Sequence, residues 1–234
     1  MAGPPERAVG PAVGAPGGGV LAPAIRYRDS RLRRIVDVLL VLTGLLVLLP
    51  LLVALAVAVR LDTRGPALFR QVRVGRGGKP FEILKFRSMV VTPAGSGPQV
   101  SGCRDPRITR VGRVLRGTRL DELPQLVNVL RGEMTVFGPR AEVPRYVDHY
   151  TPRERCLLDV RPGIVGAGQL MFAQDQAAAL DEADDPERHY LDHQLHPKLA
   201  LDLAYLDARG PWGDLRLACA TARYLTGRQR VPKS

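Results

Sequence analysis

The amino-acid sequence predicts a mainly α-helical fold with one small β-hairpin and an N-terminal membrane helix. Three patterns support this fold class: a long apolar run from Ile35 to Val59, a strand–turn–strand pattern over residues 67–86, and apolar residues at helical spacing further along the chain. The length of 234 residues suits one domain of ordinary size with extensions.

Composition divides the chain into four segments. Residues 1–25 are rich in Gly, Pro and Ala and cannot bury enough apolar surface to fold, so a disordered tail is expected. Residues 26–60 form the membrane helix with its basic flanks. Residues 61–226 form a compact domain, and residues 227–234 form a basic tail.

The apolar run is broken only by Asp37, Thr43, Gly44 and Pro50. A helix of ~20 apolar residues can span the ~30 Å hydrocarbon core of a bilayer, so a membrane segment is predicted rather than a buried soluble helix. Pro50 lies near the middle of the run, where it removes a backbone donor and clashes with the preceding turn. We therefore expect the helix to kink or break at Pro50.

Basic residues flank this helix on both sides. The upstream set is Arg26, Arg28, Arg31, Arg33 and Arg34, and the downstream set is Arg60, Arg64, Arg70, Arg73 and Arg76. A crossing helix normally has its Lys/Arg excess on one side. Two basic flanks around a central proline suggest a re-entrant helix that returns to the same face, while an ordinary kinked span fits these observations about equally well.

The hairpin and the helices that follow are predicted from the spacing of apolar residues and from glycine-rich turns. Strands are expected over 67–74 and 80–86, joined by the turn Gly75-Arg76-Gly77-Gly78. A helix is expected where Leu123, Leu126, Val127 and Leu130 share a face before Gly132. Asp121 and Glu122 then lie at its N-terminal end. Residues 212–224 are expected to form an amphipathic basic helix.

The net charge of +11 calls for an anionic partner, such as lipid headgroups, phosphorylated substrates or nucleic acid. Aromatic residues make up only 5%, which argues against a surface that stacks nucleic-acid bases. The three cysteines are far apart and lack metal-ligand spacing. Neither a P-loop nor a Gly-x-Ser-x-Gly nucleophile motif occurs.

The carboxylate pair Asp121 and Glu122 is the strongest candidate for chemistry. Adjacent carboxylates at a helix start often only complement the helix dipole. Here, however, cations lie on both sides of the pair in the sequence: Lys85, Arg87, Arg113, Arg116, Arg119 and Arg140. Arginine forks clamp phosphoryl oxygens, and Mg²⁺ takes one or two carboxylates together with substrate phosphates. Phosphoryl transfer needs this combination.

Five stretches in order resemble one family. They are Lys85-Phe86-Arg87-Ser88-Met89, Asp105-Pro106-Arg107-Ile108-Thr109, Leu120-Asp121-Glu122-Leu123-Pro124 preceded by Leu115-Arg116, Phe137-Gly138-Pro139-Arg140, and Arg161-Pro162-Gly163-Ile164. The chain resembles the bacterial sugar transferases, which are monotopic polyprenyl-phosphate phosphoglycosyl transferases, from about Arg31 to Leu225.

The resemblance implies a re-entrant membrane helix broken at a proline, a place that Pro50 fits. It also implies a compact catalytic domain with amphipathic surface helices on the cytoplasmic face of the cell (inner) membrane. Asp121 would carry a covalent phosphosugar, and Glu122 would position Asp121 or join it in holding Mg²⁺. The side chains expected to bind substrate phosphates are Lys85, Arg87, Arg116 and Arg140.

The implied reaction transfers a sugar-1-phosphate from a UDP-sugar to a polyprenyl (undecaprenyl) phosphate, giving polyprenyl diphosphosugar and UMP. It would be the first membrane step of exopolysaccharide or glycoconjugate assembly. The expected partners are these substrates and the lipid bilayer, and nucleic acid is not expected. The resemblance is compatible with a homodimer and does not identify the sugar. The alternative is a non-enzymatic, membrane-anchored basic adaptor that binds anionic lipid or nucleic acid, which leaves the carboxylate pair unexplained.

Overall fold

A computed structural model of the protein describes residues 30–90, 99–172 and 175–226. The expected disordered tail and the basic C-terminal tail lie outside these residues. The helices, short helical turns (η) and strands are α2 (Arg31–Asp62), β1 (Leu68–Val74), η1 (Arg76–Gly78), β2 (Pro80–Phe86), α3 (Arg110–Thr118), η2 (Leu120–Glu122), α4 (Gln125–Arg131), β3 (Thr135–Phe137), α5 (Pro144–Val147), η3 (Glu154–Asp159), β4 (Gly163–Val165), α6 (Ala167–Phe172), α7 (Asp175–Glu182), α8 (Pro186–His189), η4 (Tyr190–Leu195), α9 (His196–Asp207) and α10 (Pro211–Leu225).

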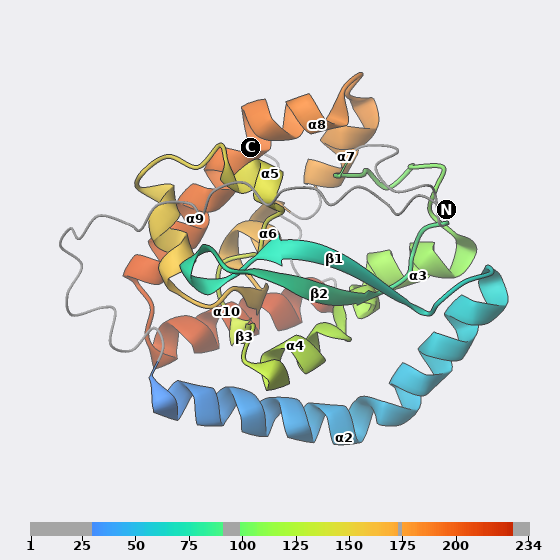
Figure 1. Cartoon of the computed structure of the whole chain (residues 1–234), viewed down its shortest axis with the longest axis horizontal. Coiled ribbons are helices and arrows are strands. Elements are labelled where there is room, and N and C mark those ends of the chain that lie inside the picture. Colours follow the sequence, from blue (N-terminus) through green and yellow to red (C-terminus); the bar gives the residue numbers. More distant parts are fainter. Residues whose placement is uncertain (1–29, 91–98, 173–174, 227–234) are drawn as a thin grey trace, which may run out of the picture.

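Helix α2 is a single helix of 32 residues that runs along the outside of the domain and bends part-way (Figure 1). The Ser30 side chain caps its start by accepting a hydrogen bond from the Arg33 amide at 3.2 Å. Pro50 lies inside the helix, which continues past it. Of the kink or break expected at Pro50, the break does not occur, because a proline removes only one donor and the turns on either side keep theirs.

The outer face of α2 is apolar and exposed. Its exposed side chains include Leu39, Leu46, Val47, Val53 and Leu61, and only 6% of its most apolar 18-residue stretch is buried. The helix is long and apolar enough to cross a membrane, and a core helix of a soluble protein would instead be mostly buried. The exposed apolar face is suited to contact with lipid, in keeping with the membrane helix that the sequence predicts.

The N-terminal half of α2 is attached to the domain by a buried polar cluster. Asp37 accepts hydrogen bonds from the Thr135 hydroxyl at 2.6 Å and from the Val136 amide at 3.3 Å. Arg33 donates to the carbonyl of Phe137 and lies 3.3 Å from an oxygen of Asp214. Both α2 side chains are 6% exposed, so the domain rather than water solvates these charges.

The C-terminal half of α2 is attached to the same domain at a second place. Arg87, directly after β2, donates to the carbonyl oxygens of Val59, Thr63 and Arg64 at 2.6–3.3 Å. The Asp62 carboxylate accepts from the amide of Val111 at the start of α3, at 3.0 Å. Both ends of the bent helix thus contact one domain.

Strands β1 and β2 form the expected antiparallel hairpin, with Leu68 opposite Phe86 and Val74 opposite Pro80. A second sheet, which the sequence did not predict, is the parallel pair β3 and β4. Gly163 makes this pair possible: a Cβ there would lie 2.1 Å from the amide nitrogen of Gly138, so any other residue would force the strands apart.

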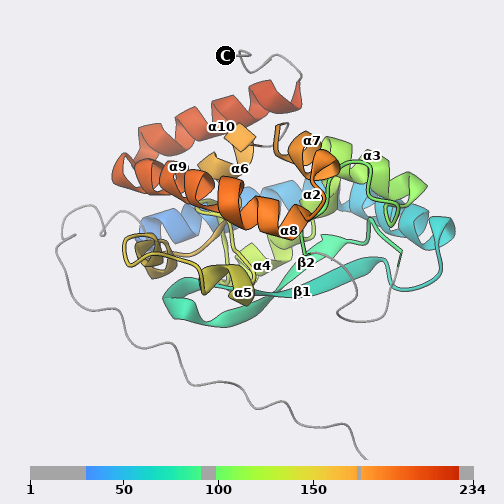
Figure 2. The same ribbon diagram turned by 90° about the horizontal axis from the view of Figure 1, so that it is seen from above.

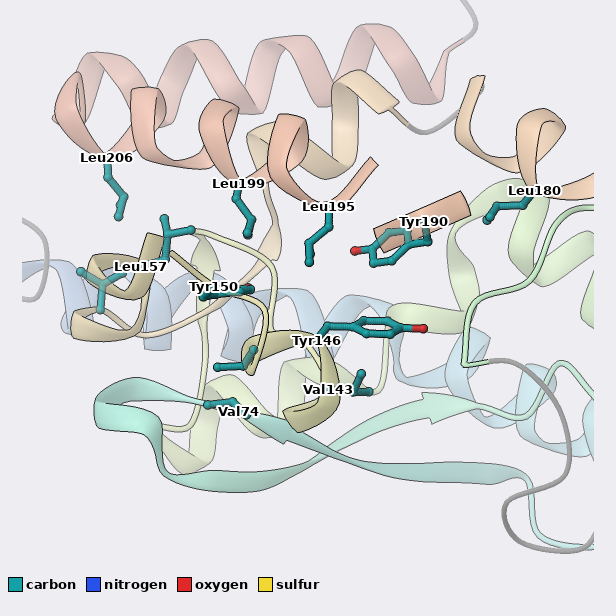
Figure 3. Close-up of a cluster of buried hydrophobic side chains, with 12 residues drawn as sticks. Val74, Val143, Tyr146, Tyr150, Leu157, Leu180, Tyr190, Leu195, Leu199 and Leu206 are labelled. Atoms are coloured by element: carbon teal, nitrogen blue, oxygen red, sulfur yellow. The ribbon is translucent and has the colours of Figure 1, made fainter. Parts of the chain in front are cut away.

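The largest buried cluster lies between the hairpin and helix α9. Figure 3 shows Leu195, Leu199 and Leu206 pointing from the α9 side toward Tyr146, Tyr150 and Val74. Figure 2 shows the resulting layers, with the hairpin on one side and helices α9 and α10 on the other. Leu199, Leu203 and Leu206 lie in α9, and the expected amphipathic helix over 212–224 is α10.

Candidate active site

Asp121 and Glu122 lie in the short turn η2, directly before α4 rather than within it. Arg119 precedes the turn with φ of 61°, the left-handed conformation that ends α3 and redirects the chain. It is the one non-glycine residue with positive φ in the described part of the chain. Asp121 is 8% exposed and Glu122 is 6% exposed, so the turn carries both carboxylates into the domain.

Glu122 is held by three side chains from three different elements. Its Oε1 accepts from Lys85 Nζ of β2 at 2.9 Å and from Arg140 Nη2, in the loop after β3, at 3.1 Å. Its Oε2 accepts from Gln169 Nε2 of α6 at 3.1 Å. Both oxygens of Glu122 are therefore engaged, and the carboxylate has one fixed orientation.

Asp121 is held differently from its neighbour. No hydrogen bond or ion pair joins its carboxylate to another residue within the described ranges 30–90, 99–172 and 175–226. Arg116 and Arg119 are close enough to act on its charge. Arg116 also donates to the Ser101 hydroxyl at 2.9 Å, which fixes the guanidinium beside this part of the site.

The two carboxyl groups have opposite pKa shifts. Burial, and next the charge of Glu122, raise the pKa of Asp121, against the opposing effect of Lys85. Burial would also raise the pKa of Glu122, but Lys85 and Arg140 outweigh it and hold that pKa well below its usual range. Glu122 is thus a permanent anion within an ion-pair cluster, whereas the buried charge of Asp121 is left for an external partner to compensate.

The structure brings together five of the six predicted charged site residues. Asp121, Glu122, Lys85 and Arg140 form one cluster, and Arg116 lies beside it. Arg87 does not join them, because its guanidinium holds the carbonyls at the C-terminal end of α2. These contacts attach β2 to the end of α2, and the phosphate-binding role of Arg87 stays a prediction.

Sequence reasoning missed Asp202 of α9, which connects two parts of the site. Its carboxylate accepts from the Gly168 amide at 2.8 Å and from the Arg140 amide at 3.3 Å, so it joins the loop that carries Arg140 to the helix that carries Gln169. Gly168 allows this approach, since a Cβ there would lie 2.4 Å from the Lys198 carbonyl oxygen. Burial raises the pKa of Asp202 to about 6.

A second missed group lies behind Arg140. The Glu142 carboxylate accepts from the Tyr190 hydroxyl at 2.8 Å and lies 3.4 Å from Arg73 and 3.8 Å from Lys198. Burial lowers the pKa of Lys198 to about 8. These buried charges neutralise one another and give the Arg140 loop a rigid support.

A cavity of ≈ 190 Å³ opens beside Glu122. Residues of η2, α4, β4, α6 and α10 line it: Arg119, Glu122, Leu123, Leu126, Ile164, Val165, Gly166, Gln169, Leu170, Thr221 and Tyr224. Glu122 and Gln169, which are hydrogen-bonded to each other, belong to this lining, and most of the remaining wall is aliphatic. The charged cluster therefore continues into an apolar space.

The fit of the expected Mg²⁺ depends on Asp121. No group of three or more His, Cys, Asp and Glu side chains that could hold a metal ion occurs among the described residues. Both Glu122 oxygens already accept from nitrogen donors, so Asp121 is the carboxylate of the pair with free oxygens. Mg²⁺ commonly binds through one or two carboxylates and completes its shell with substrate phosphates and water, and this donor set fits that mode.

Asp121 is a buried carboxylate that has no hydrogen-bond or ion-pair partner among the described residues and lies among fixed cations. This arrangement suits the handling of phosphoryl groups. The class that the fold and the site define is a membrane-associated phosphotransferase. Comparison with known proteins agrees: the profile of the family "Bacterial sugar transferase" matches residues 28–228. The chain belongs to the bacterial sugar transferase family.

Several relatives are similar over most of the chain. A UDP-glucose:undecaprenyl-phosphate glucose-1-phosphate transferase of Caulobacter vibrioides is 35% identical over 88% of this chain and 72% of its own length. A UDP-N-acetylgalactosamine-undecaprenyl-phosphate N-acetylgalactosaminephosphotransferase of Aeromonas hydrophila is 37% identical over 89% of this chain and 47% of its own length. The exopolysaccharide production protein PSS of Rhizobium leguminosarum is 40% identical over 61% of this chain and 74% of its own length.

Proposed function

We propose that this enzyme transfers a sugar-1-phosphate from a UDP-sugar to undecaprenyl phosphate or a related polyprenyl phosphate, at the membrane. The activities for which the Caulobacter and Aeromonas relatives are named support the donor class and the acceptor. The observation that carries the proposal is the asymmetry of the carboxylate pair, in which Glu122 is held by three donors and Asp121 by none of the described residues. The name of the Rhizobium relative supports a place at the start of exopolysaccharide or glycoconjugate assembly.

In the proposed reaction, an Asp121 oxygen attacks the sugar-bearing phosphorus of the UDP-sugar. The bond from that phosphorus to the bridging oxygen breaks, and UMP leaves with the electron pair. A phosphate oxygen of the polyprenyl phosphate then attacks the same phosphorus and displaces Asp121, giving polyprenyl diphosphosugar. A covalent intermediate divides the displacement in two, so the two anionic substrates need not be present together.

The other site residues serve this chemistry through charge and position. Arg116 and Arg119 lie on the Asp121 side of the cluster and can neutralise the transferring phosphoryl group. Lys85 and Arg140 hold Glu122, whose fixed negative charge keeps both cations in place. Mg²⁺ held by Asp121, with Glu122 beside it, would supply further charge neutralisation to the diphosphate.

The decisive experiment is UMP release from UDP-sugars without any lipid acceptor. A double-displacement enzyme should release close to one UMP per enzyme in a rapid burst with its own donor and then stop. A panel of UDP-glucose, UDP-galactose and UDP-N-acetylaminosugars would also identify the donor. A membrane-anchored adaptor would release none, and UMP release that requires the acceptor would exclude the covalent route.

We propose further that α2 is re-entrant and that the catalytic domain lies on the cytoplasmic face of the inner membrane. The support is that Asp37, near the start of α2, and Asp62, at its end, both bond to the same domain. A straight helix of 32 residues would measure about 48 Å at 1.5 Å per residue, which would carry one end across the ~30 Å core. The bend at Pro50 allows both ends to stay on one side.

Replacement of Pro50 tests this topology. Pro50→Leu restores the missing backbone donor and favours a straight helix, which cannot keep both attachments. In a variant without its native cysteines, a single cysteine at position 8 should stay unlabelled by a membrane-impermeant thiol reagent added to intact cells. The Pro50→Leu form should gain labelling, and Leu49→Ala serves as the matched control. Efficient labelling with Pro50 in place would show that α2 crosses the membrane.

A further inference from the structure

The cavity beside Glu122 differs in character along its length. Gln169 donates a hydrogen bond to Glu122 at 3.1 Å, and Arg119 also lines the cavity. The aliphatic lining comes from the start of α4, β4 and α6, with Leu126 and Ile164 among its residues. A ligand that fills the space therefore needs a charged or polar end at η2 and an apolar body beyond it.

Thr221 of α10 adds to this apolar character. Its hydroxyl donates to the Leu217 carbonyl of its own helix at 2.8 Å, so its hydrogen is already used within α10. A uracil base or a sugar ring carries several polar groups, each of which loses free energy when it is buried without a hydrogen-bond partner. The aliphatic walls offer few such partners, so they suit a hydrocarbon better than the polar parts of a nucleotide sugar.

Helix α10 connects the cavity to the apolar outside of the molecule. Leu217 is buried, and Thr221 and Tyr224 follow on the same face at helical spacing toward the cavity. On other faces of the helix, Trp212 is 75% exposed and Leu215 is 51% exposed. An amphipathic helix with an exposed tryptophan is typical of a membrane interface, so the cavity wall is also an element that can meet lipid.

We propose that the aliphatic part of this cavity holds the first isoprenoid units of the polyprenyl phosphate, with its phosphate directed toward Asp121 and the cation Arg119. This inference rests on the proposed function and adds the place of the acceptor. Sites that enclose a whole drug-sized ligand measure about 300–1,000 Å³, so ≈ 190 Å³ is enough only for the part of the chain next to the phosphate. The rest of the chain stays in the bilayer.

The double displacement separates the two substrates, and a cavity-filling variant can therefore show which one uses the cavity. In Thr221→Trp, the indole should occupy the aliphatic space. The burst of UMP from the UDP-sugar alone should stay within about twofold of wild type. Discharge of the isolated phosphosugar-enzyme by polyprenyl phosphate, followed by mass spectrometry, should slow at least tenfold. Ala222→Trp, an exposed neighbour on α10 outside the cavity lining, should leave both steps near wild type.

The other outcomes are equally clear. An equal loss of burst and discharge in Thr221→Trp would assign the cavity to the donor, and unchanged discharge would show that the acceptor does not use it; both overturn the proposal. If Thr221→Trp does not fold, as judged by thermal melting, Leu170→Phe fills the cavity from α6 and takes its place. Absence of a UMP burst in wild type would instead contradict the proposed function.

Discussion

Asp121→Asn is expected to abolish turnover while the protein stays folded and bound to membranes. The amide keeps the shape of the side chain but cannot attack phosphorus. Asp121 makes no hydrogen bond or ion pair with another residue in the part of the chain that the structure describes, so the substitution breaks no described contact. A residual turnover above a few per cent of wild type, with deamidation excluded, would overturn the assignment of the nucleophile.

The same variant should be at least as stable as wild type, because the pKa of Asp121 is raised by burial and by Glu122. A carboxyl whose folded pKa is raised costs stability when it is ionised, so the cost is present at neutral pH and fades as pH falls toward the range of an ordinary aspartate. The thermal midpoint of Asp121→Asn should thus equal or exceed that of wild type at pH 7.5. The difference should shrink toward pH 4.

Mass spectrometry distinguishes the loss of the nucleophile from a general loss of activity. Wild type incubated with its UDP-sugar should carry a phosphosugar adduct on the peptide that contains Asp121, and Asp121→Asn should carry none. Asp148→Asn, which changes an exposed aspartate, is the matched control and should keep both adduct and turnover. An adduct on any other peptide would relocate the nucleophile.

Arg140→Ala is expected to lower kcat by about 10²–10³, the usual cost of removing one group that stabilises charge in a transition state. It should also destabilise the fold, because it leaves Glu122 with Lys85 as the one cation bonded to it among the described residues. Removing one partner of a buried ion pair commonly costs about 3–5 kcal/mol. Activity assays and thermal melts of the same preparation measure both effects.

A double-mutant cycle with Glu122→Gln shows how these losses arise. Glu122→Gln alone should lower activity by a similar factor, since Lys85 and Arg140 lose their common anion. The double variant should be more stable than Arg140→Ala, because the buried group at position 122 is then no longer a carboxylate short of one partner. Additive losses of stability would show that the two groups do not interact. Arg140→Lys keeps the positive charge but not the forked guanidinium, so its activity and its stability should fall between those of wild type and Arg140→Ala.

Much of the fold could be predicted because its signals are local. The hairpin is marked by alternation and by the Gly-rich turn at 75–78, and α4 by apolar spacing that ends at Gly132, where φ is 83°. The strands β3 and β4 have three residues each, too few for any periodicity to be detected. Their pairing depends on the close approach of Gly138 and Gly163, which only the folded chain reveals.

Site residues could be predicted where charged residues lie close together in the sequence. Asp121 and Glu122 are adjacent, and cations surround them in the sequence. Gln169 and Asp202 gave no signal, because a single polar residue in a helical pattern normally faces water. Arg87 was grouped with Lys85 because the two lie close together in the sequence at the end of the predicted hairpin. Strand β2 ends at Phe86, and the guanidinium of Arg87 donates to the carbonyl of Thr63 just after α2.

The buried cluster around Arg33 and Asp37 has a consequence for how the protein is made. These two charged side chains are synthesised early, whereas Asp214, which pairs with Arg33, follows about 180 residues later. At ~5–20 residues per second this interval is roughly 10–35 s. During that time the apolar helix carries two charges without their final partners, and charged groups enter hydrocarbon at considerable cost. We therefore expect α2 to reach its final depth in the bilayer only after the segment that carries Asp214 has been synthesised, so that membrane insertion and folding of the domain occur as one event.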